Sequence, residues 1–152
     1  MSTTYLCLVS LDPEWTPQND EQIEKMVALA WEAFPDSEEI EPLTHKYLAF
    51  VHPFENLQSV TCPNCNTGIL EWFWELIDDE SYQGEALPMM NVEYPCCKKF
   101  GSLAELIFHW PATFAKFQLD VMNPEVDEFP TDLVARLESI TGQKFGGIWA
   151  YL

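Results

Sequence analysis

The sequence predicts an α+β fold, with a mixed or antiparallel sheet, flanking helices and an inserted zinc-ribbon-like cysteine module. Two periodicities support the strands and helices: alternating apolar residues are typical of half-buried strands, and apolar residues at every third or fourth position are typical of helices. Two cysteine pairs in the middle of the chain, each with a proline beside a cysteine, indicate the module. With 152 residues, 47% of them hydrophobic, we expect a single domain over 1–152 in which 57–110 form the module.

The first third is predicted to form a strand, a helix and a second strand. Alternating apolar residues over Tyr5–Leu11 indicate the first strand. Asn19 or Asp20 can cap a helix, because the apolar residues that follow fall on one helical face. An acidic loop over 36–41 is expected to precede a second strand near His45–Val51. The apolar residues of the predicted helix are Ile23, Met26, Val27, Ala30, Trp31 and Phe34.

The middle third is expected to hold three short elements around the cysteines. Apolar residues at helical spacing predict a helix over 69–77, and alternation predicts a strand over 90–94. Ser102 and Glu105 have the spacing of a capping box, so a short helix is expected to start at Ser102 and run toward His109.

The last third repeats the order of the first. Residues 115–121 alternate between apolar and polar side chains and predict a half-buried strand. A helix is expected over Leu133–Ile140, followed by Gly142 at the position where glycine commonly ends a helix. Residues 148–152 predict a final strand or turn.

Four of the five cysteines predict a structural zinc site. Cys62 and Cys65 have the C-x-x-C spacing whose turn points two thiolates at one ion, and Cys96 and Cys97 supply the other half. Adjacent cysteines bind one ion only with a sharp local bend, so a histidine can replace one of them. Two alternatives stay open: a thioredoxin-type redox pair, which needs a helix beginning at Cys62, and free buried cysteines without metal. The candidate replacement ligands are His109, His52 and His45.

Charge and composition limit the classes of function. Twenty-five acidic residues against seven Lys and Arg give a net charge of −18. Binding to nucleic acid and to anionic membranes is disfavoured, because both need clustered Lys and Arg. No export signal or membrane-spanning run is expected, and five cysteines, with Cys7 predicted in the core, favour reduced thiols in the cytoplasm. The expected partner is a basic protein.

The sequence predicts no enzyme activity and no catalytic residue. It holds no P-loop, no dinucleotide-binding glycine motif, no H-E-x-x-H and no Ser-His-Asp order. Acidic residues concentrate in two segments: 12–41 holds ten against one Lys, and 71–93 holds seven and no basic residue. Acidic groups and aromatic anchors of the second segment are expected to bind the partner. These residues are Trp72, Trp74, Asp78, Asp79, Glu80 and Tyr82.

Several motifs together resemble a group of small uncharacterised bacterial proteins. Members carry CPxC, PCC, a serine-leucine start, WPxxFA(R/K)F, NP and IWxY, and the resemblance covers about the last 95 residues. It implies a zinc-ribbon-like element in an α+β domain, and it implies no activity. This sequence lacks a glycine after Cys65 and after Cys97, which makes both cysteine turns less favourable. The motifs here are Cys62-Pro63-Asn64-Cys65, Pro95-Cys96-Cys97, Ser102-Leu103, the run from Trp110 to Phe117, Asn123-Pro124 and Ile148-Trp149-Ala150-Tyr151.

Three hypotheses of function follow. The first is a non-catalytic acidic binding protein, a bacterial immunity protein that neutralises a cognate basic toxin, since complementary charge accelerates and orients association. The second is a zinc-stabilised adaptor or regulatory module with another protein partner. The third is a zinc or thiol enzyme, which a closed four-ligand site disfavours because it leaves no position for water.

Overall fold

The computed structural model describes residues 3–51, 57–77, 92–126 and 128–151, and it shows an α+β protein with antiparallel sheets. No helix within these ranges is both long and apolar enough to cross a membrane. In chain order the elements are β1 (Thr4–Ser10), α1 (Asp20–Ala33), β2 (Glu39–Val51), β3 (Ser59–Thr61), α2 (Leu70–Ile77), β4 (Val92–Glu93), β5 (Phe100–Gly101), a 3-10 helix (Leu103–Glu105), β6 (Ile107–His109), β7 (Thr113–Met122), α3 (Thr131–Thr141) and β8 (Phe145–Tyr151).

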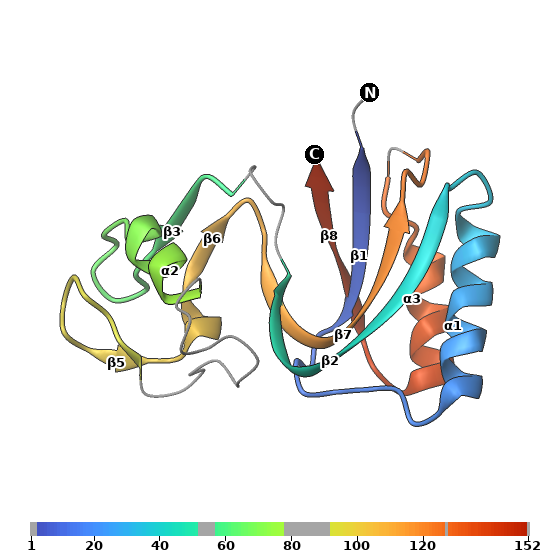
Figure 1. Cartoon of the computed structure of the whole chain (residues 1–152), viewed down its shortest axis with the longest axis horizontal. Coiled ribbons are helices and arrows are strands. Elements are labelled where there is room, and N and C mark those ends of the chain that lie inside the picture. The colour runs from blue at the N-terminus through green and yellow to red at the C-terminus, as the bar shows by residue number, and fades with distance from the viewer. Residues whose placement is uncertain (1–2, 52–56, 78–91, 127, 152) are drawn as a thin grey trace.

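The largest sheet has four strands in the order β2-β7-β1-β8, and all neighbouring pairs are antiparallel. β1, α1 and β2 form one β-α-β unit, and β7, α3 and β8 form another. The strands of each unit enclose one strand of the other, which is the split β-α-β arrangement of ferredoxin-like sheets. Both helices cover the same face of this sheet (Figure 1). The predicted repetition of strand, helix and strand is therefore confirmed.

Local signals place both long helices where the sequence predicts them. The Asn19 side chain caps α1 by accepting a hydrogen bond of 2.9 Å from the backbone N–H of Gln22. Gly142 ends α3 with φ at 75°, and its N–H donates to the Glu138 carbonyl at 2.7 Å. The apolar faces of both helices pack on the sheet to form the first core. Its fully buried members include Leu6, Leu8, Met26, Ala30, Phe34, Leu119, Val121 and Leu137.

The buried face of α1 differs from the prediction at one aromatic residue. Trp31, which was expected on the buried face, is 39% exposed, whereas Leu29 is buried. The reason is that α1 packs against α3 as well as against the sheet, so its buried stripe is turned toward Met26, Leu29 and Ala30. Trp31 therefore lies at the surface of the molecule.

The prediction of an acidic loop over 36–41 is wrong in its second half, because β2 already begins at Glu39. Ile40 is buried in the first core, while its neighbours Glu39 and Glu41 are exposed. This alternation is typical of a strand, and Glu39–Glu41 pair with the end of β7. The two carboxylates are thus held on a rigid element.

The prediction of a helix starting at Ser102 is also wrong beyond its first turn. The Ser102 side chain accepts a hydrogen bond from the Ala104 N–H at 3.1 Å, as a cap does, but only a 3-10 helix follows. The next residues form β6, which pairs antiparallel with β3. Pairing with a strand some 48 residues away in the sequence replaces the helical hydrogen bonds. A local capping signal does not reveal such a partner.

Residues 57–77 and 92–110, called the cysteine module below, are inserted between β2 and β7. The module lies away from α1 and α3, on the opposite side of the four-stranded sheet (Figure 1). A second core fills it and joins it to the sheet, because Phe50 of β2 has its ring centroid 4.9 Å from Phe73 and 5.1 Å from Phe114. The buried members of this core are Leu57, Val60, Cys62, Ile69, Phe73, Val92, Tyr94, Leu103, Leu106 and Phe114.

Candidate metal centre

The four cysteines of the two predicted pairs converge at one point of the cysteine module. The Sγ atoms of Cys62, Cys65, Cys96 and Cys97 all lie within 4.8 Å of one another. Cys65 Sγ is 3.2 Å from Cys96 Sγ, and Cys62 Sγ is 3.8 Å from Cys97 Sγ. Four thiolates in a tetrahedron around zinc, with bonds of about 2.3 Å, stand about 3.8 Å apart. The sulfur positions therefore fit a single ion of that size.

The first cysteine turn is closed by two backbone hydrogen bonds. The Cys62 N–H donates to the Thr67 carbonyl at 2.9 Å, and the Asn66 N–H donates back to the Cys62 carbonyl at 3.0 Å. Asn66 takes the left-handed conformation, with φ at 61°, which asparagine tolerates better than most residues. A β-bridge between Thr61 and Gly68 closes the base of the turn. Cys62 and Cys65 are thereby held on one side of a rigid loop.

The second cysteine turn has the same backbone structure, 32 positions later. The Tyr94 N–H donates to the Lys99 carbonyl at 2.9 Å, and the Lys98 N–H donates to the Tyr94 carbonyl at 3.0 Å. Lys98 has φ at 62°, as Asn66 has in the first turn. Tyr94 therefore occupies the position of Cys62, and Cys97 occupies the position of Cys65.

This equivalence explains how two adjacent cysteines can point their sulfurs at one position. Cys97 holds the position that Cys65 has in the first turn. Cys96 lies at the tip of the second turn, where the first turn has Asn64. The shared order x-Pro-x-Cys, at 62–65 and at 94–97, was the signal in the sequence for this repeat. Cysteine spacing alone does not reveal this repeat, because Tyr94 stands in the second turn where the first has Cys62.

Tyr94 supports the second turn from inside the module. Its side chain is fully buried, and its hydroxyl donates to the Ser102 carbonyl at 2.8 Å. The ring lies against the backbone of Gly101, where an added Cβ would overlap the Tyr94 hydroxyl and lie 2.8 Å from Cζ. Only glycine leaves room for the ring at this position.

Gly101→Ala is therefore expected to destabilise the protein by about 1–3 kcal/mol, because the buried ring must move to accommodate the methyl group. Urea unfolding of the metal-loaded protein measures this. Gly68→Ala is the matched control, since a Cβ there meets no atom within 4 Å. Equal effects of the two substitutions would contradict the close packing of Tyr94 on Gly101.

Lys98→Gly is expected to stabilise the protein by about 0.5–1 kcal/mol, because glycine adopts the left-handed conformation without the strain of a Cβ. Lys99→Gly is the control: it removes the same charge beside the cysteines, but Lys99 is not among the described residues with positive φ. That control is expected to destabilise by about 0.5–1 kcal/mol. Urea unfolding measures the free energy of unfolding of both variants. A loss of stability in Lys98→Gly would count against the turn geometry.

Hydrogen bonds to a hydroxyl and between thiols shift the pKa values of two of the cysteines in opposite directions. The Thr67 hydroxyl, 3.2 Å from Cys65 Sγ, and then the Cys96 thiol lower the pKa of Cys65 to about 6. Desolvation, followed by the hydrogen bond with Cys65, raises the pKa of Cys96 to about 12. Binding of a metal releases the protons that remain on the thiols.

The described histidines lie outside the sulfur group. His45 of β2 has its Nε2 atom 2.8 Å from Gln118 Oε1, and His109 ends β6 opposite Ser59. Among the described residues, the group of candidate metal ligands consists of the four cysteines alone. His52, the third candidate, lies outside the described residues.

The surroundings of the cysteines differ from those of the two alternatives. Cys62 begins a turn, and α2 starts only at Leu70, whereas a thioredoxin-type pair lies at the beginning of a helix. Of the four cysteines only Cys62 is fully buried, as the second alternative expects of all of them, whereas Cys65 is exposed and Cys96 and Cys97 are half-buried. Cys7 is buried in β1, as predicted, and burial together with the nearby Asp120 carboxylate raises the pKa of its thiol.

The structure describes two of the six residues predicted to bind a partner. Trp72 and Trp74 lie on α2, and both pack against the second core. The Trp74 ring centroid is 6.0 Å from that of Phe50, whereas Trp72 lines a hollow of about 510 Å³ with residues of β3 and α2. The other four, Asp78, Asp79, Glu80 and Tyr82, lie outside the described residues.

Comparison with known proteins finds no matching protein family, no matching curated protein and no matching solved structure. The similarity to small bacterial proteins inferred from the motifs therefore stays a prediction. Support for a metal at this site comes from the sulfur positions and the two turns that hold them.

Proposed function

We propose that this protein is a non-catalytic binding protein, stabilised by one structural zinc ion, that engages a basic protein partner. The convergence of four cysteine sulfurs within 4.8 Å is the observation that carries the metal half of the proposal. Four thiolates complete the tetrahedral coordination that zinc prefers and leave no position for a reactive water. This supports a structural role for the ion and argues against zinc catalysis.

The identity of the metal is tested by analysis of the protein purified without a histidine tag. We expect about one equivalent of zinc per chain, bound by Cys62, Cys65, Cys96 and Cys97. Iron is the other metal commonly found in four-sulfur sites, and its colour would reveal it. A metal-free, fully folded protein with four titratable thiols at these positions would refute the metal half.

The partner half rests on the acidic residues of segment 12–41. This segment has ten carboxylates. Among the described residues, three of them form ion pairs: Glu14, Glu21 and Glu32. β2 is the edge strand beside α1, and because Ile40 faces the first core, Glu39 and Glu41 project from the other face of this edge. We infer that the exposed carboxylates of α1, together with those along this sheet edge, form a negative surface, called the α1 surface below. Such a surface raises the association rate of a cationic partner by roughly 10- to 1,000-fold.

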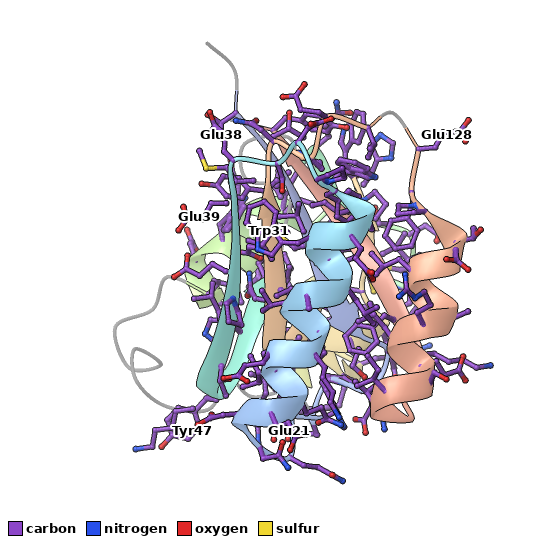
Figure 2. The ribbon with its side chains drawn as sticks, turned by 90° about the vertical axis from the view of Figure 1, so that its right-hand side faces the viewer. Glu21, Trp31, Glu38, Glu39, Tyr47 and Glu128 are labelled. Carbon is purple, nitrogen blue, oxygen red and sulfur yellow. The ribbon has the colours of Figure 1, made fainter. Side chains whose placement is uncertain are left out.

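An aromatic anchor lies within this surface. Trp31 is 39% exposed on α1, and Figure 2 shows it between Glu21 at one end of the helix and Glu38 and Glu39 toward the other. Partly exposed tryptophans commonly contribute much of the binding energy at protein interfaces. Trp31 is therefore a better candidate than Trp74, whose ring packs in the second core.

A bacterial immunity protein that neutralises a basic toxin in the cytoplasm is the biological role that we propose for such a surface. High acidity, small size and the charge complementarity that speeds association support this role. The partner is first isolated by pull-down from a lysate with a salt titration, and a toxin gene adjacent to the gene for this chain would support its identity.

Association kinetics with the isolated partner then test the α1 surface. Reversal of Glu38, Glu39 and Glu41 to Lys is expected to lower the association rate by about tenfold or more at low salt. A matched control reverses Glu71, Glu93 and Glu105 to Lys, which changes the net charge equally at exposed residues of the cysteine module, on the opposite side of the sheet. Trp31→Ala is expected to accelerate dissociation. Equal association rates for both triple variants, or no dependence on salt, would contradict the proposal.

A further inference from the structure

The four sulfurs of the metal centre differ in their access to solvent. Cys62 is fully buried, Cys96 and Cys97 are half-buried, and Cys65 is exposed. Cys65 and Cys96 are also the closer pair, with Sγ atoms 3.2 Å apart, against 3.8 Å for Cys62 and Cys97. The site therefore has an outer pair, Cys65 with Cys96, and an inner pair, Cys62 with Cys97.

The outer pair results from the unusual second turn. Because Tyr94 occupies the buried position that a cysteine fills in the first turn, the fourth ligand comes from the tip of the turn, at Cys96. The equivalent tip residue of the first turn, Asn64, is exposed. Moving a ligand from the base of a turn to its tip carries its sulfur outward, next to Cys65.

We propose that Cys65 and Cys96 form an oxidation site for small hydroperoxides, at which a disulfide replaces the metal. This inference rests on the proposed zinc ion. Thiolates that are accessible to solvent and have a second thiolate beside them are the cysteines that react with peroxide and then form disulfides. The outer pair meets both conditions, whereas the inner pair includes the fully buried Cys62.

The chemistry balances with hydrogen peroxide as the oxidant. The Cys65 thiolate attacks one peroxide oxygen, the O–O bond breaks, and hydroxide leaves, so that Cys65 becomes a sulfenic acid. The Cys96 thiolate then attacks this sulfur, and a second hydroxide leaves as the S–S bond forms. The two sulfurs lose two electrons, and the peroxide becomes two hydroxides that are protonated to water. Only the Cys62 and Cys97 sulfurs would then remain to hold zinc, so a bound ion would be released as Zn²⁺.

The disulfide would join the same two turns that the metal joins. Cys65 belongs to the first turn and Cys96 to the second, 31 positions later. Oxidation thus exchanges a metal cross-link for a covalent one, while Cys62 and Cys97 become free thiols. The cysteine module is expected to stay closed after it loses its metal, and reduction with added zinc is expected to restore the original site.

The test treats the zinc-loaded full chain with hydrogen peroxide while a chromogenic chelator records released zinc. We expect about one zinc released per disulfide formed, and titratable thiols in denaturant falling from five to three. Peptide mapping by mass spectrometry is expected to find the Cys65–Cys96 bond. A first disulfide between Cys62 and Cys97, a bond between neighbours Cys96 and Cys97, or zinc retained with all thiols intact would overturn the inference.

Two variants sharpen this test. Cys7→Ser keeps all four ligands and is expected to release zinc at the wild-type rate, since Cys7 is buried in β1. The double variant Tyr94→Cys with Cys96→Asn copies the first turn and moves the ligand to the buried position, so zinc release is expected to slow about tenfold. If the double variant fails to fold, the disulfide mapped in the wild-type chain is the result that supports or overturns the inference.

The two proposals fail in different ways. Untreated protein without zinc contradicts the proposed metal centre itself. Untreated protein with one zinc that peroxide neither releases nor replaces with the Cys65–Cys96 bond leaves the structural zinc in place and refutes only the oxidation site.

Discussion

Removal of the proposed zinc ion is expected to unfold the cysteine module while the helix-covered sheet stays folded. Structural zinc contributes on the order of 10 kcal/mol in small modules of this kind. Without it, the module keeps only the one short helix α2, the second core and two ribbons of two strands each, β3 with β6 and β4 with β5, and such ribbons are marginally stable alone. The sheet of β2, β7, β1 and β8 has its own core against α1 and α3 and needs no metal.

Amide hydrogen exchange, with and without a zinc chelator, measures this effect by region. We expect the amides of Val60, Cys62 and Tyr94 to lose protection, and those of Leu6 and Leu119 to keep it. Tryptophan fluorescence should change too, because Trp72 and Trp74 pack in the module core. Unchanged protection at the module amides would show that the four cysteines do not need a metal.

Cys62→Ser is expected to reproduce the effect of the chelator, since it removes a buried ligand. Cys7→Ser is the control, because it makes the same chemical change at a buried cysteine that lies outside the sulfur group. The free energy of unfolding of the control is expected to fall by only about 1–3 kcal/mol, which is the penalty of a buried hydroxyl. Comparable melting temperatures of the two variants would contradict the metal interpretation.

Phe73→Ala is expected to destabilise the protein by about 3–5 kcal/mol, the usual loss when a buried aromatic ring is truncated. Phe73 of α2 is fully buried. Its ring centroid lies 4.9 Å from that of Phe50 on β2 and 5.3 Å from that of Phe108 on β6. It therefore joins the module helix to a strand of the large sheet and to a strand of the module.

Phe100→Ala makes the same truncation in the same module at a ring that is 65% exposed, and it is expected to change stability by less than about 0.5 kcal/mol. Urea unfolding of both zinc-loaded variants gives the comparison. If the losses are similar, the contacts between Phe73, Phe50 and Phe108 do not connect the module to the sheet as described.

Features that depend on neighbouring residues could be predicted from the sequence. Asn19 caps α1 and Gly142 ends α3, because each acts on backbone groups within four residues. Each cysteine turn is local for the same reason, since it is closed by bonds between residues five positions apart or fewer. The meeting of the two turns was predicted from the four ligands that zinc requires. The prediction of a half-buried strand over 115–121 also agrees with β7.

Features that depend on distant partners were decided by the tertiary structure. The order β2-β7-β1-β8 requires β1 to pair with strands more than 100 residues later, and no local pattern encodes that choice. Glu39–Glu41 form a strand because β7 pairs with them, and the residues after Ser102 leave the helix because β3 pairs with β6. Trp31 reached the surface because α3 packs beside α1 and turns the buried face of that helix. Local propensity leaves the possible strand partners and helix faces nearly equal in free energy. Hydrogen bonds and burial between residues far apart in the sequence form only when the whole chain folds. For this reason only the tertiary structure could select among them.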